Sequence, residues 1–259
     1  MVNKHTVIPD GQVKPGVSLD HWKWAGEYIA TKHPDTIINI GDFADMHSLS
    51  SYDIGQKVYE GRTYKADIEA AHYAMELFMT PIVKEIKRLR SNRKKQWNPR
   101  LVITLGNHED RITRAIEADR KLEGTISLDD LPYKKWGYEV IPFKEPINLD
   151  GIMYCHYFTT GVMGRPVTSA RALTIKKHQS CVMGHNPATE IDMSQVRADG
   201  TPLISIFAGA FYAHQEEYLG VQGNPVHRQI WMLHEVQDGF FYPMAVSLEY
   251  LRKRYGEHN

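Results

Sequence analysis

Short apolar, β-branched runs alternate with longer stretches of helical periodicity in the first half of the chain. The runs at 6–9, 36–40 and 101–105 predict buried strands, because each is bounded by Gly, Asp, Asn or Pro. Residues 21–32 and 64–91 space their apolar side chains as an amphipathic helix does, and Pro81 predicts a kink in the second. This alternation indicates a parallel or mixed sheet with helices on its faces.

The second half of the chain is richer in strand patterns. Residues 147–156 predict a hairpin that turns at Asp150 and Gly151, residues 167–177 predict a helix, and further strands are expected at 180–184, 202–208, 230–234 and 240–246. Because no linker or low-complexity tract divides the halves, we expect one α/β domain, 1–259, built from two packed sheets. The polar, irregular segments 46–63 and 116–138 are expected to be lid-like insertions over a site at the strand ends.

Composition narrows the class of protein. The 259 residues are 42% hydrophobic and 24% charged, as in globular proteins, and 31 basic residues balance 31 acidic ones. No net charge therefore draws the chain to nucleic acid or a membrane, although the basic run 84–95 leaves local nucleic-acid contact open beside its more common reading as a solvated helix end. Because the sequence shows neither an apolar membrane span nor the apolar core of a signal peptide, we expect a soluble, cytoplasmic chain. Its two cysteines lie in apolar runs and are expected to be reduced thiols. The oligomeric state is not indicated.

Residues that bind metals or transfer protons follow the predicted strands. They are Asp10 and Gln12, Asp42 and Asp45, Asn107 and His108, His156, and His185. Strand ends are where open α/β sheets form their ligand sites. Mixed oxygen and nitrogen donors suit Mn, Fe, Zn or similar ions rather than Ca, and an aspartate flanked by two such sets can bridge two ions.

The order of these residues resembles a known family. The segments GDFAD at 41–45 and GNHE at 106–109, with Asp10 before them and His156 and His185 after them, resemble the calcineurin-like metallophosphoesterase superfamily, whose pattern is D-x-H, G-D-x-x-D, G-N-H-[DE], a lone H and G-H-x-H. The segment 41–53 also looks like phosphoesterases commonly encoded by bacteriophages, which would place the chain in a host cytoplasm. The resemblance implies a four-layer αββα sandwich of two mixed sheets flanked by helices. It also implies hydrolysis of phosphate esters by a hydroxide that bridges two metal ions.

The resemblance also implies a role for each matching residue. Asp42 would bridge the two ions, and Asn107, His156 and His185 would complete the shell of one of them. Asp10 would hold the other ion. His108 would protonate the leaving oxygen, and Asp45 would orient the His108 ring.

Two departures from the family pattern fall on the same ion. Gln12 stands where the family has a histidine, and Pro187 replaces the second histidine of G-H-x-H. We therefore expect one tight and one weaker site for divalent cations, with Mn as the first choice and Fe, Zn, Ni and Mg as alternatives. His214 follows a predicted strand near the metals and is expected to supply the missing ligand, the alternative being a surface or lid histidine.

Arg111 and Arg165 are the candidate phosphate-binding residues, because guanidinium groups bind phosphate oxygens in pairs. The alternative for each is a salt bridge to an acid such as Glu109 or Asp110. The expected function is a metal-dependent phosphoesterase acting on a phosphorylated small molecule or nucleotide. One alternative is a nuclease or nucleotide phosphodiesterase (pyrophosphatase). The other is a degenerate, non-catalytic metal-binding module. The presence of both His108 and Asp45 argues against this module, since a structural ion needs no acid–base pair.

Overall fold

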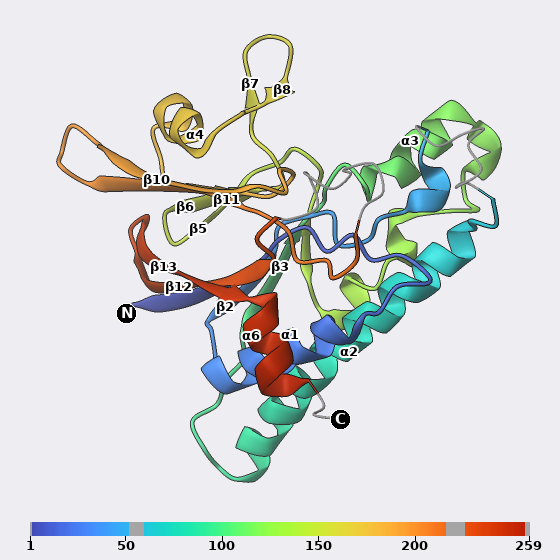
Figure 1. Ribbon diagram of the computed structural model, residues 1–259, viewed down its shortest axis with the longest axis horizontal. Coiled ribbons are helices and arrows are strands. Elements are labelled where there is room, and N and C mark those ends of the chain that lie inside the picture. The colour runs from blue at the N-terminus through green and yellow to red at the C-terminus, as the bar shows by residue number, and fades with distance from the viewer. Residues whose placement is uncertain (1, 52–59, 216–225, 257–259) are drawn as a thin grey trace.

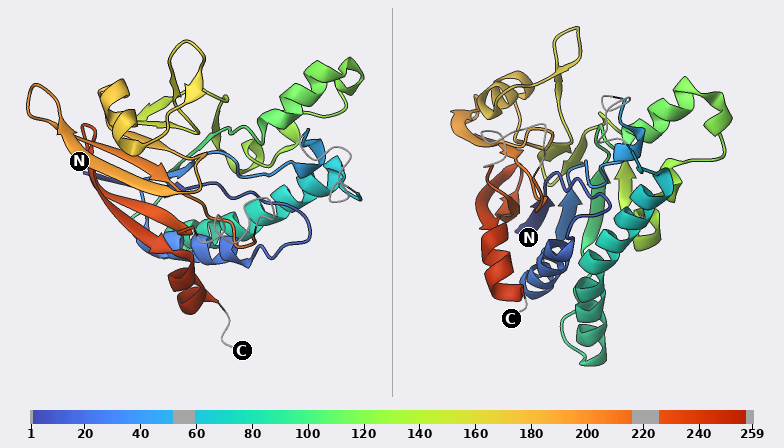
Figure 2. Two further views of the ribbon diagram at one scale, coloured as in Figure 1. Left: turned by 45° about the horizontal axis from the view of Figure 1, so that its top comes forward. Right: turned by 45° about the vertical axis from the view of Figure 1, so that its right-hand side comes forward.

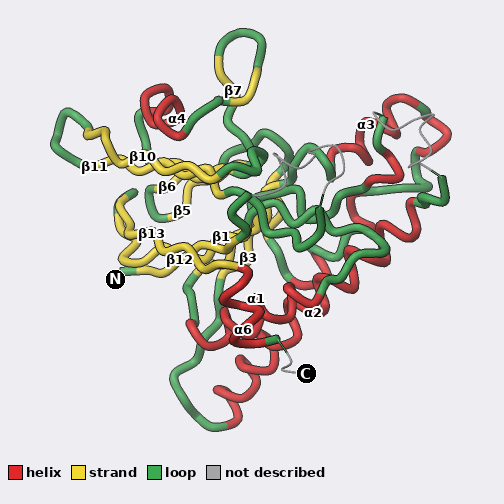
Figure 3. Tube along the Cα trace, viewed as in Figure 1, coloured by secondary structure: helices red, strands yellow, loops and turns green. Residues whose placement is uncertain are grey.

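Two large β-sheets lie face to face, and helices cover the outer face of each (Figures 1 and 3). The computed structural model describes residues 2–51, 60–215 and 226–256. Within them, one sheet has six strands in the order β13-β12-β1-β2-β3-β4, and the other has five in the order β10-β11-β9-β6-β5. The α/β class and the four-layer sandwich of mixed sheets are thereby confirmed.

The first sheet has a parallel part and an antiparallel part. β1 (Asn3–Ile8), β2 (Thr36–Asn39), β3 (Arg100–Thr104) and β4 (Glu139–Ile141) are parallel, whereas β12 (Gln229–Gln237) and β13 (Phe240–Ser247) extend the β1 side antiparallel. Its outer face carries α1 (Asp20–Lys32), α2 (Tyr64–Ser91) and α6 (Leu248–Tyr255), which Figure 2 shows side by side.

The second sheet has parallel central strands and antiparallel edges. β6 (Ile152–Cys155), β9 (Cys181–Met183) and β11 (Pro202–Ala208) form the centre, with β5 (Ile147–Leu149) and β10 (Thr189–Val196) at the edges. Helix α4 (Ala170–Lys177) packs on its outer face. A small hairpin of β7 (Thr159–Thr160) and β8 (Arg165–Pro166) projects away from both sheets (Figure 1).

Short helical elements follow β2 and β3. They are α3 (Asp110–Ala118) and the 3-10 helices η1 (His47–Leu49), η3 (Arg120–Leu122), η4 (Leu128–Asp130) and η5 (Lys134–Trp136). The segment 116–138 therefore begins in the last turn of α3 and includes three of these short helices. Of the segment 46–63, residues 52–59 lie outside the described part of the chain.

Side-chain alternation in the strands explains the two apolar layers. Val7, Ile38 and Val102 face the second sheet, whereas their neighbours Ile8, Ile37 and Ile103 face the helices, and all are fully buried. Because both faces of the parallel strands are covered, those strands read as continuous apolar runs.

Several predicted elements have the expected bounds, and others were missed. The helix at 64–91, with Pro81 inside it, and the strand at 202–208 match the prediction, and the hairpin turns at Asp150 and Gly151, which both have positive φ. The sequence interpretation missed β4, β10, the β7–β8 hairpin and α6. Both cysteines are buried and unpaired. None of the helices in the described ranges is long and apolar enough to cross a bilayer.

Candidate metal centre and acid–base pair

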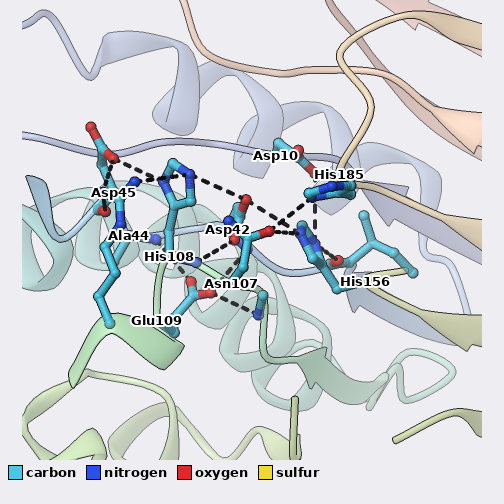
Figure 4. Close-up of polar contacts among 12 residues, drawn as sticks. Asp10, Asp42, Ala44, Asp45, Asn107, His108, Glu109, His156 and His185 are labelled. Atoms are coloured by element: carbon cyan, nitrogen blue, oxygen red, sulfur yellow. Dashed lines mark hydrogen bonds and ion pairs between the residues drawn. The ribbon is translucent and has the colours of Figure 1, made fainter. Parts of the chain in front are cut away.

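The carboxyl ends of five strands meet at one edge of the two sheets. The side chains that follow these strands are Asp10, Asp42, Asn107, His156 and His185, and they lie together in Figure 4. They converge because β1, β2 and β3 are parallel in one sheet, and β6 and β9 are parallel in the other. This position at the strand ends is the usual ligand site of open α/β sheets.

Four of these side chains direct ligand atoms toward one another. The Asn107 Oδ1 lies 2.8 Å from Nδ1 of His185 and 3.1 Å from Nε2 of His156. The Asp42 Oδ2 lies 3.3 Å from the same Nε2. Asp42, His156 and His185 each offer a ligand atom within 4.8 Å of the others. This set of carboxylate, amide and imidazole donors fits a divalent transition-metal ion.

The His156 ring is oriented by a backbone carbonyl. Its Nδ1 lies 2.9 Å from the Ile40 oxygen, so Nδ1 carries a proton and donates it, and Nε2 faces Asp42 and Asn107. Burial lowers the pKa of His156, but the charges of Asp42 and Asp10 outweigh burial and raise it to about 9. The buried carboxylates thus favour a positive charge at this place, as a cation site must.

The other three titratable ligand candidates respond to the same charges. Burial raises the pKa of the Asp10 carboxyl to about 7, against the lowering effect of His156, and its Oδ1 accepts the His185 backbone N–H at 3.1 Å. Burial and the nearby His156 lower the pKa of His185 to about 4, so its ring is neutral at pH 7, the form that binds metals. For Asp42, the electrostatic effects of His108 and His156 outweigh burial and hold the pKa well below its usual range.

Glycines before the ligand residues allow this close approach. A Cβ on Gly106 would overlap the Asp42 carboxylate, and a Cβ on Gly184 would overlap that of Asp10. Gly41 has φ of +95°, and a Cβ there would lie 2.6 Å from Nδ1 of His156. Only residues without a side chain can occupy these positions while the loops remain where they are.

His108 and Asp45 form an acid–base pair next to the ligand cluster. Nδ1 of His108 lies 2.8 Å from the Asp45 Oδ1, and its Nε2 lies 3.7 Å from the Asp42 Oδ2 (Figure 4). Burial lowers the pKa of His108, but Asp42 and Asp45 raise it above its ordinary value. For Asp45, burial is outweighed by the hydrogen bond and charge of His108 and by Arg111, so its pKa is well below the usual range. Asp45 is therefore an ionised acceptor that can hold the ring with Nε2 toward the cluster.

The two candidate phosphate-binding arginines lie in different surroundings. The Arg111 Nη1 donates to the Asp45 backbone oxygen at 2.7 Å and to its Oδ1 at 3.0 Å, and Nη2 lies 3.3 Å from Nε2 of His108. Its acidic partner is thus Asp45 rather than Glu109 or Asp110. Arg165 is exposed in the β7–β8 hairpin, where its backbone pairs with Thr160. Arg111 touches the acid–base pair, and a phosphate-binding role for either arginine stays a prediction.

Gln12 approaches the cluster through its backbone, and the chain reaches Asp10 three residues before His214. Gln12 is buried with φ of +40°, and its N–H donates to the Asp42 carbonyl at 2.8 Å. The chain before His214 reaches Asp10, whose carbonyl accepts the Phe211 N–H at 2.8 Å. The His214 ring itself lies against Tyr212, with centroids 5.0 Å apart. Ligation by Gln12 or His214 stays a prediction.

Glu109 has a role that the sequence interpretation missed. Its fully buried carboxylate accepts the backbone N–H groups of Asp42 and Ala44 at 3.0 Å each and of Gly106 at 2.8 Å, and also the Tyr133 hydroxyl at 2.9 Å. It therefore ties the loop after β2 to the loop after β3. The sequence signal that could have indicated this role is the position of Glu109 within GNHE, directly before the start of a helix.

Comparisons with known proteins add little to this geometry. No family model and no curated protein matches the chain. One solved structure aligns over 96% of this chain and 100% of its own, at 15% identity and a TM-score of 0.36. Another, a conserved uncharacterized protein from Streptococcus pneumoniae TIGR4 described as a predicted phosphoesterase, aligns over 95% and 100%, at 11% identity and a TM-score of 0.32. Likenesses this weak identify neither fold nor activity.

Proposed function

We propose that this chain is a metal-dependent phosphoesterase. The observation that supports it best is the position of the His108–Asp45 pair beside a cluster of metal-binding side chains, with Nε2 of His108 3.7 Å from the Asp42 carboxylate. A structural metal site requires the cluster alone. Hydrolysis of an ester additionally requires a proton donor for the leaving oxygen, and His108 supplies one.

The described side chains fit the divalent ions that this chemistry uses. Asp42, Asn107, His156 and His185 would hold one ion, and Asp10 would hold a second with Asp42 between them, helped by Gln12 and His214. When bound, such ions lower the pKa of water toward neutrality and offset the negative charge of a phosphate ester. Because the second ion would have the weaker ligand set, we propose two unequal sites, with Mn as our first choice of ion.

The protein's own groups would then position the ester and move the proton. Asp45 holds the His108 ring so that Nε2, the nitrogen that would donate, faces the cluster. The Arg111 Nη2 lies 3.3 Å from that nitrogen, where a guanidinium can also hydrogen-bond a phosphate oxygen. Protonation lets the leaving group depart as a neutral alcohol, so the bond to phosphorus breaks without a free alkoxide.

We expect a small phosphate ester as the substrate, because the basic run 84–95 lies far from the site. The basic run 84–95 begins in the last third of α2, a helix whose first turns lie near η1 and the site. Twenty residues of helix separate Tyr64 from Lys84, which is about 30 Å at 1.5 Å per residue. A strand bound at this run would be remote from His108, so the run does not support a nuclease.

A His108→Ala variant tests the proposal. Hydrolysis of benzyl phosphate and of its methyl ester, whose alcohol leaving groups need a proton, should fall by about 10²-fold or more when measured with added Mn, while the metal content stays at the wild-type level. The matched control is His234→Ala, in β12, which should behave as wild type. Unchanged turnover in His108→Ala would exclude the assigned role, and absence of Mn-stimulated hydrolysis in the wild type, across mono- and diesters, would overturn the proposed function.

A further inference from the structure

The tip of the β7–β8 hairpin carries two large apolar side chains that face water. Val162 is fully exposed and Met163 is 75% exposed, and both lie in the middle of the turn that the Gly164 N–H and the Gly161 carbonyl close at 3.3 Å. Such turn positions are usually occupied by Gly, Pro, Asn, Asp or Ser. Neither packing nor turn geometry therefore accounts for an apolar pair at this place.

The hairpin and α4 project from the same side of the molecule. Figures 1 and 2 show both on the outer side of the second sheet, with the hairpin tip extending beyond α4. On α4, the exposed residues Arg171 and Ile175 lie four positions apart and share the outward face of the helix. The exposed side chains of both elements form what we call the hairpin–α4 surface: Val162, Met163, Arg165, Arg171, Ile175 and Lys176.

This part of the chain has an excess of positive charge, although the whole chain is neutral. The segment 151–189 contains no Asp or Glu, and its four cations are Arg165, Arg171, Lys176 and Lys177. Within the described ranges, none of the four forms a salt bridge, whereas Arg88 on α2 pairs with Glu85. Their charges are therefore available to an external partner.

Two acids of β10 lie close to this surface, because α4 packs against β10. The Glu190 carboxylate accepts the Ala170 N–H at 2.8 Å, and the buried Asp192 carboxylate accepts the Ser194 hydroxyl at 2.6 Å. Four cations against these two acids leave two net positive charges, and three of the four cations are exposed. The surface therefore attracts anions.

We propose that the hairpin–α4 surface binds an anionic lipid bilayer. Val162 and Met163 insert among the lipid headgroups and upper acyl chains, where apolar side chains lose their contact with water. The cations lie against the headgroups, and each one near an anionic surface strengthens binding by about fivefold. Binding of this kind requires no metal ion and no hydrolysis, so it is independent of the proposed phosphoesterase function.

The composition of the surface favours a bilayer over two other occupants. Single-stranded nucleic acid is held by exposed aromatic rings on which bases stack, and the one aromatic residue in 158–180, Phe158, is buried. A second copy of the chain that docked through the same surface would bring cations against cations. An aliphatic tip next to unpaired cations fits an apolar layer beneath anionic headgroups.

Sedimentation with lipid vesicles measures this binding directly. The full wild-type chain is mixed with vesicles of equal parts phosphatidylcholine and phosphatidylglycerol, and with vesicles of phosphatidylcholine alone. The apparent Kd should be about 10-fold lower or more for the anionic vesicles at low salt, and this difference should shrink as salt is added. Equal binding to the two compositions, or binding to neither, would overturn the proposal.

A double variant of the tip tests the apolar contribution. Val162→Ser with Met163→Ser should raise the apparent Kd for anionic vesicles by about 10-fold or more, because less apolar surface leaves water on binding. Val2→Ser, which replaces an exposed valine next to β1, is the matched control and should bind as wild type does. Wild-type affinity in the tip variant would contradict insertion of the hairpin.

A double variant of α4 tests the charge contribution. Arg171→Gln with Lys176→Gln should raise the apparent Kd for anionic vesicles by about 10-fold or more. Lys94→Gln with Lys95→Gln, in the exposed loop after α2, removes the same net charge elsewhere and should have little effect. Equal losses in the two double variants would show a response to net charge alone and would overturn the assignment to this surface.

Two further measurements test the other occupants. Fluorescence anisotropy with a labelled DNA duplex should show weaker binding than the anionic vesicles do, and sedimentation equilibrium should give wild type and the tip variant the same molar mass. Tighter binding of the duplex than of the vesicles would assign the surface to nucleic acid. Self-association that is lost in the tip variant would assign it to a second copy, and either result would overturn the bilayer proposal.

Discussion

Replacing Glu109 by glutamine should destabilise the fold and disturb the site together. The carboxylate accepts four hydrogen bonds, two at each oxygen: Ala44 N–H and Tyr133 O–H at Oε1, and Asp42 N–H and Gly106 N–H at Oε2. A glutamine side chain keeps the shape of glutamate but replaces one acceptor oxygen with an NH₂ group, which cannot accept.

The size of the effect follows from the donors left without an acceptor. With the NH₂ group at the Oε1 position, the Tyr133 hydroxyl can turn and accept from it, so only the Ala44 N–H is left without an acceptor; with the NH₂ group at Oε2, two backbone N–H groups are. The amide adopts the first orientation, and because the side chain is fully buried, the expected loss in the free energy of unfolding is about 1–3 kcal/mol, out of the roughly 5–15 kcal/mol that keeps a domain folded. Since the loop that carries Asp42 loses its anchor at Ala44, kcat/KM should also fall by about 10-fold or more.

Urea denaturation followed by tryptophan fluorescence measures the free energy of unfolding of Glu109→Gln against wild type. Glu117→Gln, an exposed acid on α3, is the control and should change this free energy by less than about 0.5 kcal/mol. A loss below about 1 kcal/mol in Glu109→Gln would refute the idea that this carboxylate holds the two loops together.

Three further outcomes are expected. Burial lowers the pKa of His21 to about 3, so between pH 6.5 and 5 the imidazole takes up a proton in the unfolded chain but not in the folded one. Lowering the pH over this range should therefore reduce the free energy of unfolding by about 2 kcal/mol through this group alone. Denaturation of His21→Phe at both pH values should show a pH-dependent loss that is smaller by this amount. In Gly41→Ala the new Cβ would lie 2.6 Å from Nδ1 of His156 and 2.8 Å from the Thr104 oxygen. This variant should lower the free energy of unfolding by about 2 kcal/mol or more and reduce the metal content. Wild-type values for both quantities would contradict the packing described. Metal analysis after dialysis should find nearer one ion than two per chain, whereas two ions that survive a chelator wash would contradict unequal sites.

The elements that the sequence predicted well are those whose pattern is local and strong. The helix at 64–91 repeats its apolar face over many turns, and the strand at 202–208 is a continuous apolar run because helix and sheet cover both its faces. β10 was missed because it is an edge strand with exposed Ile191 and Met193, and a register irregularity after Asp192 breaks its alternation. β4 has only three residues and depends on its pairing with β3, a tertiary contact.

In the candidate site, too, the sequence predicted what depends on local pattern and missed what depends on tertiary contacts. Glycine-bounded strand ends placed Asp42, Asn107 and His185 correctly beside one another, because parallel strands end at the same edge of a sheet. Three of the four partners of Glu109 are backbone N–H groups, which every residue except proline carries, so residue identities could not reveal them. The partner of Arg111 depends on how α3 packs near the loop after β2 and so could not be chosen from sequence spacing.

The central claim, metal-dependent ester hydrolysis at this cluster, is tested most directly by one activity measurement. Protein stripped of metal with a chelator is assayed on p-nitrophenyl phosphate and bis-p-nitrophenyl phosphate before and after Mn is returned. We predict no hydrolysis in the stripped protein and recovery on addition of Mn in the wild type but not in His156→Ala, which lacks a buried nitrogen ligand. Full activity in the stripped protein, or equal recovery in His156→Ala, would contradict the account.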